Sequence, residues 1–261
     1  MGTVEYGRNV TIHPSARINV LDRLVIGDNS TIHENVIIEG REVEIGNEAW
    51  ILPGAIIGGG SKFEEDSTLK TGHFFHMGRD TLVNIAKPIR LGNEVGLGTR
   101  TALYTHGAYV SQLEGFPVAF GPINIGHNVW LPGATVNPYV DIGDNVVVGV
   151  GSVVTKSIPS GSLAAGVPAK VIKENAYPRE VPLVEFWKEF SKVWPEVNNI
   201  AHVYEHIDVI TVRGASFFPR RKSIQGEVTP DAERLRDLLR KHGVRFYSRP
   251  DESGKFYEDW N

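Results

Sequence analysis

Residues 136–154 read Val136-Asn-Pro-Tyr-Val-Asp-Ile142-Gly-Asp-Asn-Val-Val-Val148-Gly-Val-Gly-Ser-Val-Val154, and one aliphatic residue stands at every sixth position. A helix with 3.6 residues per turn would place positions six apart on different faces, and a lone strand needs no signal at every third alternation. A period of six predicts a parallel β-helix, in which each hexapeptide forms one flat side of a coil and points its aliphatic residue inward. Earlier steps of six comprise Ile26, Ile32 and Ile38; Ile45, Ile51, Ile57, Phe63 and Leu69; and Leu91, Leu97 and Leu103.

Ile-Gly pairs accompany many of these hexapeptides, and Asn or Asp follows within two residues in most of them. The pairs are Ile26-Gly27, Ile45-Gly46, Ile57-Gly58, Ile125-Gly126 and Ile142-Gly143. This pattern predicts short strands joined by turns that tolerate a left-handed backbone. Residues 70–88 and 104–122 lack the six-residue step, so we expect both to leave the coil as loops, where function concentrates on a rigid scaffold.

Composition bounds the class of protein. The 261 residues are 41% hydrophobic and 22% charged, enough apolar material for one sizeable core. With 27 Lys and Arg against 31 Asp and Glu, the net charge is −4, which does not favour a nucleic-acid partner. The absence of cysteine excludes disulfides, thiolate metal sites and a cysteine nucleophile. Neither a signal peptide nor an apolar run of about 18 residues is visible, so we expect a soluble, cytoplasmic protein without a membrane partner.

The composition also changes along the chain. Residues 1–173 hold 24 of the 28 glycines, and residues 174–261 hold 13 of the 24 aromatic residues. We therefore expect a β-helix domain over 1–173 and a small α/β appendage over 174–261. In the appendage, periodicity and turn signals predict a helix over 182–196, a strand over 206–213, a helix from Thr229 to before Gly243, and a strand over 244–247. Such a unit is expected to be too small for a core of its own and to dock on the main body or carry acceptor recognition.

The last coils resemble a known family. Ile123-Asn-Ile-Gly-His-Asn-Val-Trp-Leu, the run from Val136 to Lys156, Ile158-Pro, and Ala164-Ala-Gly-Val-Pro-Ala-Lys-Val-Ile are similar to the hexapeptide-repeat acyltransferases, most of all to the galactoside and maltose O-acetyltransferase branch. The match is strong over about residues 70–173, looser over 10–69, and absent after about 175. The resemblance implies a mainly β protein with a left-handed parallel β-helix, a homotrimer, acetyl-coenzyme A as acyl donor, and acyl sites at subunit interfaces.

Three residues match the family's catalytic positions. In Leu103-Tyr-Thr-His-Gly the histidine is His106, which the resemblance implies is the general base. An imidazole near its ordinary pKa of about 6.5 can take a proton from a hydroxyl that attacks a thioester, so no covalent intermediate is needed. Asn84 matches an asparagine that orients the acceptor or the base, and the Gly133 amide matches the oxyanion donor. Taken alone, His106 and Asn84 would be an ordinary loop histidine and a turn asparagine.

Five further residues match positions near the donor. Trp130 stands where the family commonly has a tryptophan beside the acyl group, although an exposed aromatic covering a coil edge is an equal alternative. Thr155, Lys156 and Lys170 match closing motifs that meet coenzyme A, whose phosphates favour cationic groups. Gly151 would let the pantetheine arm approach the backbone closely. A capping threonine and solvated lysines are the alternatives for the three polar residues.

Several histidines raise a second hypothesis, a γ-class carbonic anhydrase, which shares the fold but binds zinc. A zinc site needs three converging imidazoles, and that family supplies two from one segment with four residues between them. The chain has no His-x4-His, and His73 and His76 are only three positions apart, so we expect them to be loop residues or to line an acceptor pocket, and we expect no metal. The remaining histidines of this group are His13, His33 and His127, of which His13 and His33 are expected to be surface repeats at equivalent coil positions.

A third hypothesis is a β-helix scaffold without catalysis. The first interpretation is an acetyltransferase that acts on a hydroxyl or an amine of a sugar or nucleotide-linked sugar. One histidine base would serve either nucleophile, so the sequence leaves that choice open.

Overall fold

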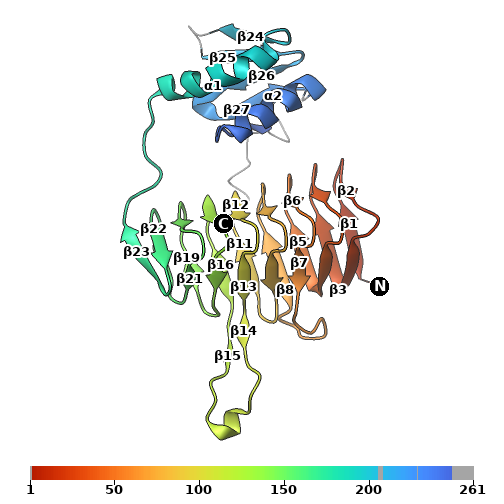
Figure 1. The fold of residues 1–261 in the computed structure, drawn as a ribbon. Coiled ribbons are helices and arrows are strands. Elements are labelled where there is room, and N and C mark those ends of the chain that lie inside the picture. Colours follow the sequence, from red (N-terminus) through yellow and green to blue (C-terminus); the bar gives the residue numbers. More distant parts are fainter. Residues whose placement is uncertain (1, 205–207, 228, 249–261) are drawn as a thin grey trace. The chain divides into compact units, whose positions relative to one another are not determined.

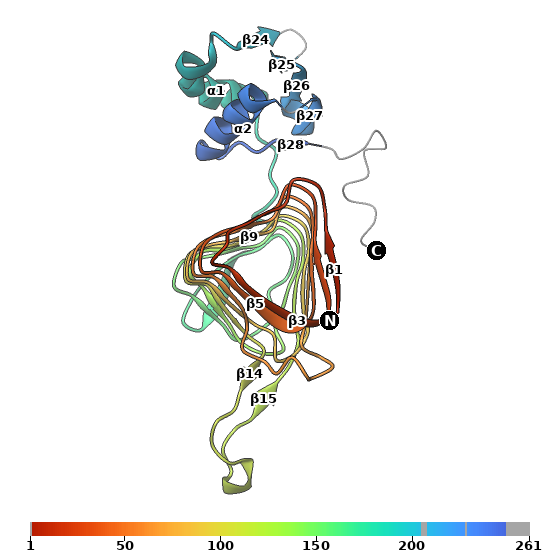
Figure 2. The same ribbon diagram turned by 90° about the vertical axis from the view of Figure 1, so that its right-hand side faces the viewer.

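The computed structural model describes residues 2–204, 208–227 and 229–248. The chain divides into two compact units, residues 1–178 and 179–261, which are described separately. The first unit is a parallel β-helix whose coils have a triangular cross-section (Figure 2). We number its flat sides 1 to 3 in the order in which the chain follows them.

Each side is a stack of parallel strands from successive coils, and sides 2 and 3 join into one sheet through β3 and β5. Side 1 contains β2 (Thr11–Ile12), β4 (Thr31–Ile32), β6 (Trp50–Ile51), β9 (His76–Met77), β12 (Val95–Leu97), β17 (Val129–Leu131), β20 (Val147–Val148) and β22 (Leu163–Gly166), and β23 (Ala169–Lys173) turns back antiparallel on β22. Side 2 contains the first halves of β3 (Arg17–Ile26) and β5 (Ile37–Ile45), then β7 (Ile56–Gly58), β10 (Leu82–Asn84), β13 (Ala102–Tyr104), β18 (Thr135–Val136) and β21 (Val153–Val154). Side 3 contains β1 (Thr3–Tyr6), the second halves of β3 and β5, then β8 (Thr68–Thr71), β11 (Ile89–Leu91), β16 (Ile123–Ile125) and β19 (Asp141–Ile142).

The six-residue period identifies the core of this unit. The aliphatic residues at those steps point into the coil and are buried, and they form one continuous cluster from Leu24 to Ala164. Phe63 is the exception, because its side chain is 72% exposed. Residues 59–67, between β7 and β8, leave the coil at that point.

Of the two segments that were expected to leave the coil as loops, residues 70–88 do not and residues 104–122 do. Residues 70–88 stay in the coil, where they contribute β9 and β10 and bury Met77 and Val83. After Leu69 the inward positions shift by two residues to Thr71, so the step continues from a polar residue that the search for aliphatic residues passed over. Residues 104–122 project from the β-helix as a hairpin of β14 (His106–Gly107) and β15 (Ala119–Phe120), with a 3-10 turn at Gln112–Glu114 (Figure 1).

We call the corners A (sides 1 and 2), B (sides 2 and 3) and C (sides 3 and 1). At corner C, one backbone N–H per coil donates to a side-chain acceptor in the next coil, at 2.6–3.0 Å. This corner ladder runs through Arg8, Asp28, Asn47, His73, Asn93, His127, Asp144 and Ser160. Burial raises the pKa of Asp28, but hydrogen bonds from the Arg8 backbone and guanidinium outweigh it and leave that pKa lowered.

The corner ladder also explains the Ile-Gly pairs. A Cβ at Gly46 would overlap the carbonyl oxygen of Gly72 and lie 2.6 Å from its carbon. The left-handed residue of that turn is Glu48, two positions later, with φ of 56°. Glycine is therefore required at Gly46 because the next coil approaches closely, and the left-handed residue that the turn was expected to contain is Glu48.

Substitutions at His127 test the corner ladder. Its Nδ1 accepts from the buried N–H of Asn93 at 2.9 Å, so His127→Ala leaves that N–H without an acceptor and should lower the free energy of unfolding by about 1–2 kcal/mol. The Asn47 and Asn93 side chains accept backbone hydrogens in the same way, so His127→Asn should lower the free energy of unfolding much less. Urea unfolding measures both variants, and equal losses would contradict a role for the ring nitrogen as an acceptor.

The outward-facing residues differ sharply between the sides. The row on side 1 is Thr11, Thr31, Trp50, His76, Gly96, Trp130, Val147 and Leu163. The row on side 2 is Arg17, Ile37, Ile56, Leu82, Ala102, Thr135 and Val153. The row on side 3 is Glu5, Val25, Glu44, Lys70, Arg90, Asn124 and Asp141. Sides 1 and 2 are thus mainly apolar or uncharged, whereas side 3 is mainly charged or polar.

The second unit is a sheet with two helices. Its strands follow the order β24 (Ala201–Tyr204), β25 (Val209–Val212), β26 (Ala215–Phe218), β27 (Ser223–Gly226) and β28 (Tyr247–Ser248), and its helices are α1 (Leu183–Val197) and α2 (Pro230–Lys241). Thr229 caps α2 as expected, because its side chain accepts from the N–H of Ala232. Of the expected strand over 206–213, residues 206 and 207 lie outside the described residues.

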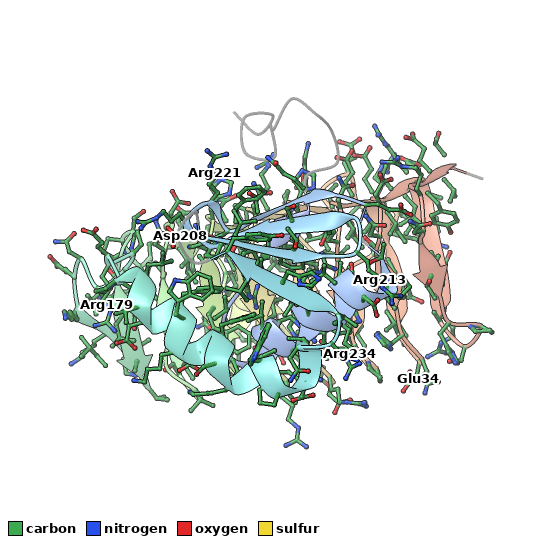
Figure 3. All side chains as sticks on the ribbon, turned by 90° about the horizontal axis from the view of Figure 1, so that it is seen from above. Glu34, Arg179, Asp208, Arg213, Arg221 and Arg234 are labelled. Atoms are coloured by element: carbon green, nitrogen blue, oxygen red, sulfur yellow. The ribbon has the colours of Figure 1, made fainter. Side chains whose placement is uncertain are left out.

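This unit has its own core, so the expectation that it is too small for one is wrong. Phe190 and Val197 of α1 pack with Phe217 of the sheet and Leu235 of α2. The sequence pattern missed β24, β26 and β27, and the apolar faces of the helices are buried against the larger sheet that these strands complete. On its surface, Asp208 accepts from Arg220 at 2.7 Å (Asp208 is labelled in Figure 3).

Candidate active site

His106 and Asn84 come together at corner B. Asn84 ends β10, and His106 begins the hairpin that follows β13, the next strand on side 2. Pairing of β10 with β13 places the two residues in adjacent coils, and His106 Nδ1 lies 2.9 Å from Asn84 Oδ1. Asn84 is buried and His106 is half-buried. Two of the expected catalytic residues are therefore neighbours in one chain.

The surroundings of Asn84 determine the tautomer of His106. Asn84 Nδ2 donates to the carbonyl oxygen of Gly59 at 3.1 Å, and a carbonyl can only accept, so the amide orientation is fixed. Asn84 Oδ1 therefore faces His106 and must accept, which places the ring hydrogen on Nδ1. In the neutral ring Nε2 then carries a free lone pair. Among the described residues nothing bonds to Nε2, so it is available as a proton acceptor.

Gly59 is needed for this arrangement, and no sequence pattern indicated it. Its φ is +78°, and a Cβ there would lie 2.5 Å from Asn84 Nδ2. The left-handed backbone favours glycine, and the close amide excludes a side chain. Gly59 begins the segment 59–67 that leaves the coil, so only the fold places it beside Asn84.

Asp66, Lys87 and Thr105 form a chain of hydrogen bonds that ends at Asn84. The buried Thr105 hydroxyl accepts from the Lys87 N–H at 3.0 Å and donates to the Asn84 carbonyl at 2.8 Å. Lys87 Nζ donates to Asp66 Oδ2 at 2.7 Å, and this bond raises the pKa of Lys87 above its ordinary value. The ammonium group therefore stays charged at this corner.

Phe120 covers one face of His106. The two residues are opposite each other in the β14–β15 pair, their ring centroids are 5.5 Å apart, and the planes differ by 16°. No sequence pattern pointed to Phe120, because His106 and Phe120 are 14 positions apart and come together only through the pairing of the hairpin strands.

Trp130 is not beside His106 in a single chain. It points outward from side 1, where its side chain is 40% exposed, whereas His106 lies at corner B between the other two sides. The indole covers Gly96 of the preceding coil, where a Cβ would come within 2.5 Å of Trp130 Cε3. One chain therefore holds the two residues on separate parts of the prism.

The residues that were expected to bind the acyl donor also lie at separate places on the β-helix. Thr155 and Lys156 lie at corner B, two coils after His106. Gly151 lies at corner A, where its φ is +72° and a Cβ would meet nothing within 4 Å. Lys170 lies on β23, opposite Ala165 of β22. All four residues are exposed.

The Gly133 amide is already engaged. It donates to Thr101 Oγ1 at 3.0 Å, across the turn at corner A. The turn from Leu131 to Val136 is one residue shorter than the six-residue step, which brings this amide onto the threonine of the coil above. Within one chain the Gly133 amide is thus bonded to Thr101, and its role as the oxyanion donor stays a prediction.

The other histidines have separate partners. Nδ1 of His73 and of His127 accept backbone hydrogens in the corner ladder, and His33 Nε2 accepts from Trp50 Nε1 at 2.7 Å. His13 and His33 lie at equivalent positions of successive coils. Within the described ranges, no group of three or more His, Cys, Asp or Glu residues is placed to hold a metal ion. No helix in the described part of the chain has the length and apolar character needed to cross a membrane.

Comparison with known proteins identifies relatives. Galactoside O-acetyltransferase of Escherichia coli (strain K12) is 34% identical over 134 residues, which cover 50% of this chain and 63% of that protein. A putative acetyltransferase of Staphylococcus aureus (strain MRSA252) is 54% identical over 70 residues, covering 26% and 35%. An N-acyltransferase from Bacillus cereus, solved with dTDP and 3-hydroxybutyryl-CoA, has a TM-score of 0.48 and 21% identity over 73% of this chain and 91% of that chain. No protein-family model matches.

The chain spans less than two thirds of the length of the curated relatives just named. The matched portion is nevertheless long enough to carry several coils of the repeat, and the fold found here is the parallel β-helix that the repeat predicts. The relatives, the six-residue repeat and this fold together make the chain similar to the hexapeptide-repeat acyltransferases.

Proposed function

We propose that this protein transfers an acetyl group from acetyl-coenzyme A to a hydroxyl or amine of a sugar or nucleotide-linked sugar, as a cytoplasmic homotrimer. His106 Nε2 takes the proton of the acceptor while the acceptor's oxygen or nitrogen attacks the thioester carbonyl. The tetrahedral intermediate then expels the coenzyme A thiolate, and the imidazolium returns the proton to the departing sulfur. Direct attack suits a chain that has no cysteine nucleophile.

The observation that carries this proposal is the bond between His106 Nδ1 and Asn84 Oδ1. A general base needs an acceptor nitrogen that points in a fixed direction, and this bond makes Nε2 the acceptor nitrogen of the neutral ring and sets its direction. The similarity to galactoside O-acetyltransferase supports the reaction class. The hypothesis of a zinc enzyme has no supporting cluster of ligands among the described residues.

The outward rows support a trimer with shared sites. A closed threefold ring repeats one contact between two different faces, here side 1 of one copy on side 2 of the next. This contact would cover the two mainly apolar rows and leave the charged row of side 3 in water. It would also bring corner B of one copy, with His106, to the edge of the neighbour's side 1, with Trp130.

Light scattering tests the assembly. At micromolar concentration the mass should be three times that of the 28.8 kDa chain. Ile56→Glu would place a charge in the row on side 2 and should shift the mass toward the single chain, whereas the same change at Asn124 on side 3 should not. A wild-type mass of one chain would contradict both the trimer and the shared site.

Donor recognition is proposed to involve Trp130, Gly151, Thr155, Lys156 and Lys170. Lys170→Glu places a negative charge where we expect the phosphates of coenzyme A, so the KM for acetyl-coenzyme A should rise about tenfold while the KM for the acceptor changes little. Steady-state kinetics with each substrate varied in turn measure both constants. A similar rise in both, or in neither, would remove Lys170 from the donor site.

An acceptor screen tests the function itself. Wild-type protein is incubated with acetyl-coenzyme A and a panel of sugars, amino sugars and nucleotide-linked sugars, and release of the free thiol is measured, with metal analysis of the same sample. Acceptor-dependent thiol release without bound zinc supports the proposal. Stoichiometric zinc with CO₂ hydration would instead favour the carbonic anhydrase, and neither activity would favour the scaffold.

A further inference from the structure

The hairpin that carries His106 is fixed at its base. The Gly121 N–H donates to the Thr105 carbonyl at 2.9 Å, and His106 pairs with Phe120 one step further out. The Tyr139 ring of the next coil lies against Gly121, where a Cβ would come within 2.6 Å of Tyr139 Cδ2. The strand that carries Phe120 is therefore held from below by a neighbouring coil as well as by its partner strand.

His106 is consequently restrained in two independent directions. The hydrogen bond to Asn84 Oδ1 acts in the plane of the imidazole and fixes which nitrogen faces inward. The nearly parallel ring of Phe120 acts perpendicular to that plane, in the offset geometry that aromatic pairs favour. A hydrogen bond alone permits the ring to tilt about the N–H···O axis. The stacked ring opposes that tilt, so the direction of Nε2 depends on both contacts.

We propose that Phe120 is a positioning residue that acts through His106: its stacked ring keeps the imidazole in the orientation in which Nδ1–H bonds to Asn84 Oδ1, and so aims Nε2 at the acceptor. The effect on turnover rests on the proposed function, whereas the effect on the ring does not. Phe120 is 41% exposed on a projecting hairpin and lies outside the buried core. Its replacement therefore changes the restraint on His106 without removing a core contact.

Magic-angle-spinning NMR of the full chain labelled with [15N]histidine measures the restraint directly. The ring nitrogen shifts distinguish the two neutral tautomers when the pH is about two units above the ordinary imidazole pKa, and the His106 signals are those lost in His106→Gln. In wild type we expect the Nδ1–H form alone. In Phe120→Ala and Phe120→Leu we expect mixed or averaged shifts, and in Phe120→Tyr, which keeps the aromatic face, the wild-type shifts.

Phe116→Ala is the matched control. Phe116 lies on the same hairpin and is 46% exposed, but it does not pair with His106. This variant should leave the His106 signals unchanged. In kinetics, Phe120→Ala should lower kcat about tenfold with little change in either KM, because a misdirected base affects the chemical step rather than binding. Phe120→Tyr should restore kcat.

The NMR result and the activity of His106→Gln can fail independently, so they separate this proposal from the proposed function. Unchanged His106 shifts in Phe120→Ala overturn the positioning role whatever the activity. A raised KM with wild-type kcat also overturns it, since Phe120 would then contact substrate. If His106→Gln keeps full activity, the proposed base is wrong, and the NMR comparison still decides whether Phe120 holds the ring.

Discussion

His106→Ala is expected to lower kcat by a factor of about 10² or more, since it removes the only nitrogen at corner B that the described structure presents with a fixed, free lone pair. The reason is chemical rather than structural. Water or buffer must then accept the acceptor's proton, with no oriented base beside the thioester. His106 is half-buried and outside the hydrophobic cluster, so the melting temperature should stay close to that of wild type.

His13→Ala is the matched control for that experiment. His13 is an exposed histidine at corner A of the same β-helix, where its ring hydrogen-bonds to Ser15, and its variant should keep wild-type kinetics. Steady-state assays and thermal melting of both variants complete the comparison. Full activity in His106→Ala would sink the assignment of the base, and a large loss in His13→Ala would point to an unspecific effect of removing imidazoles.

Gly46→Ala should produce the largest change in stability. The added Cβ would overlap the Gly72 carbonyl, and both the Gly72 carbon at 2.6 Å and the His73 nitrogen at 2.9 Å are backbone atoms. Backbone can relieve this contact only by separating two coils, which also strains the corner ladder and the strand pairs beside it. We expect a loss of about 3 kcal/mol and a fall in melting temperature of about 10 °C.

Gly107→Ala provides the comparison for that substitution. A Cβ at Gly107 meets nothing within 4 Å, and its φ is not in the left-handed region, so the melting temperature should barely change. Thermal denaturation followed by circular dichroism, at one fixed protein concentration, measures both. Equal melting temperatures for Gly46→Ala and wild type would mean that the coils can separate at little cost in free energy. That result would contradict the explanation given for the Ile-Gly pairs.

The sequence by itself determined the repeating unit and most of the core of the first unit. Positions such as Ile26, Ile51 and Val148 are buried because an inward side chain at every sixth residue is a local property of short strands joined by tight corners. The same local rule failed at Phe63 and after Leu69. There, inserted residues changed the phase of the step, and the sequence carries no signal for where the coil resumes.

Tertiary structure alone decided what surrounds His106. Asn84 is 22 positions from His106, and Gly59 is 25 positions from Asn84, and these separations depend on how many residues each corner of the coil contains. The family resemblance nominated His106 and Asn84 one by one. Only the pairing of β7 with β10 and of β10 with β13 brings Gly59, Asn84 and His106 into one hydrogen-bonded row, because contacts between coils depend on register, which the period does not specify.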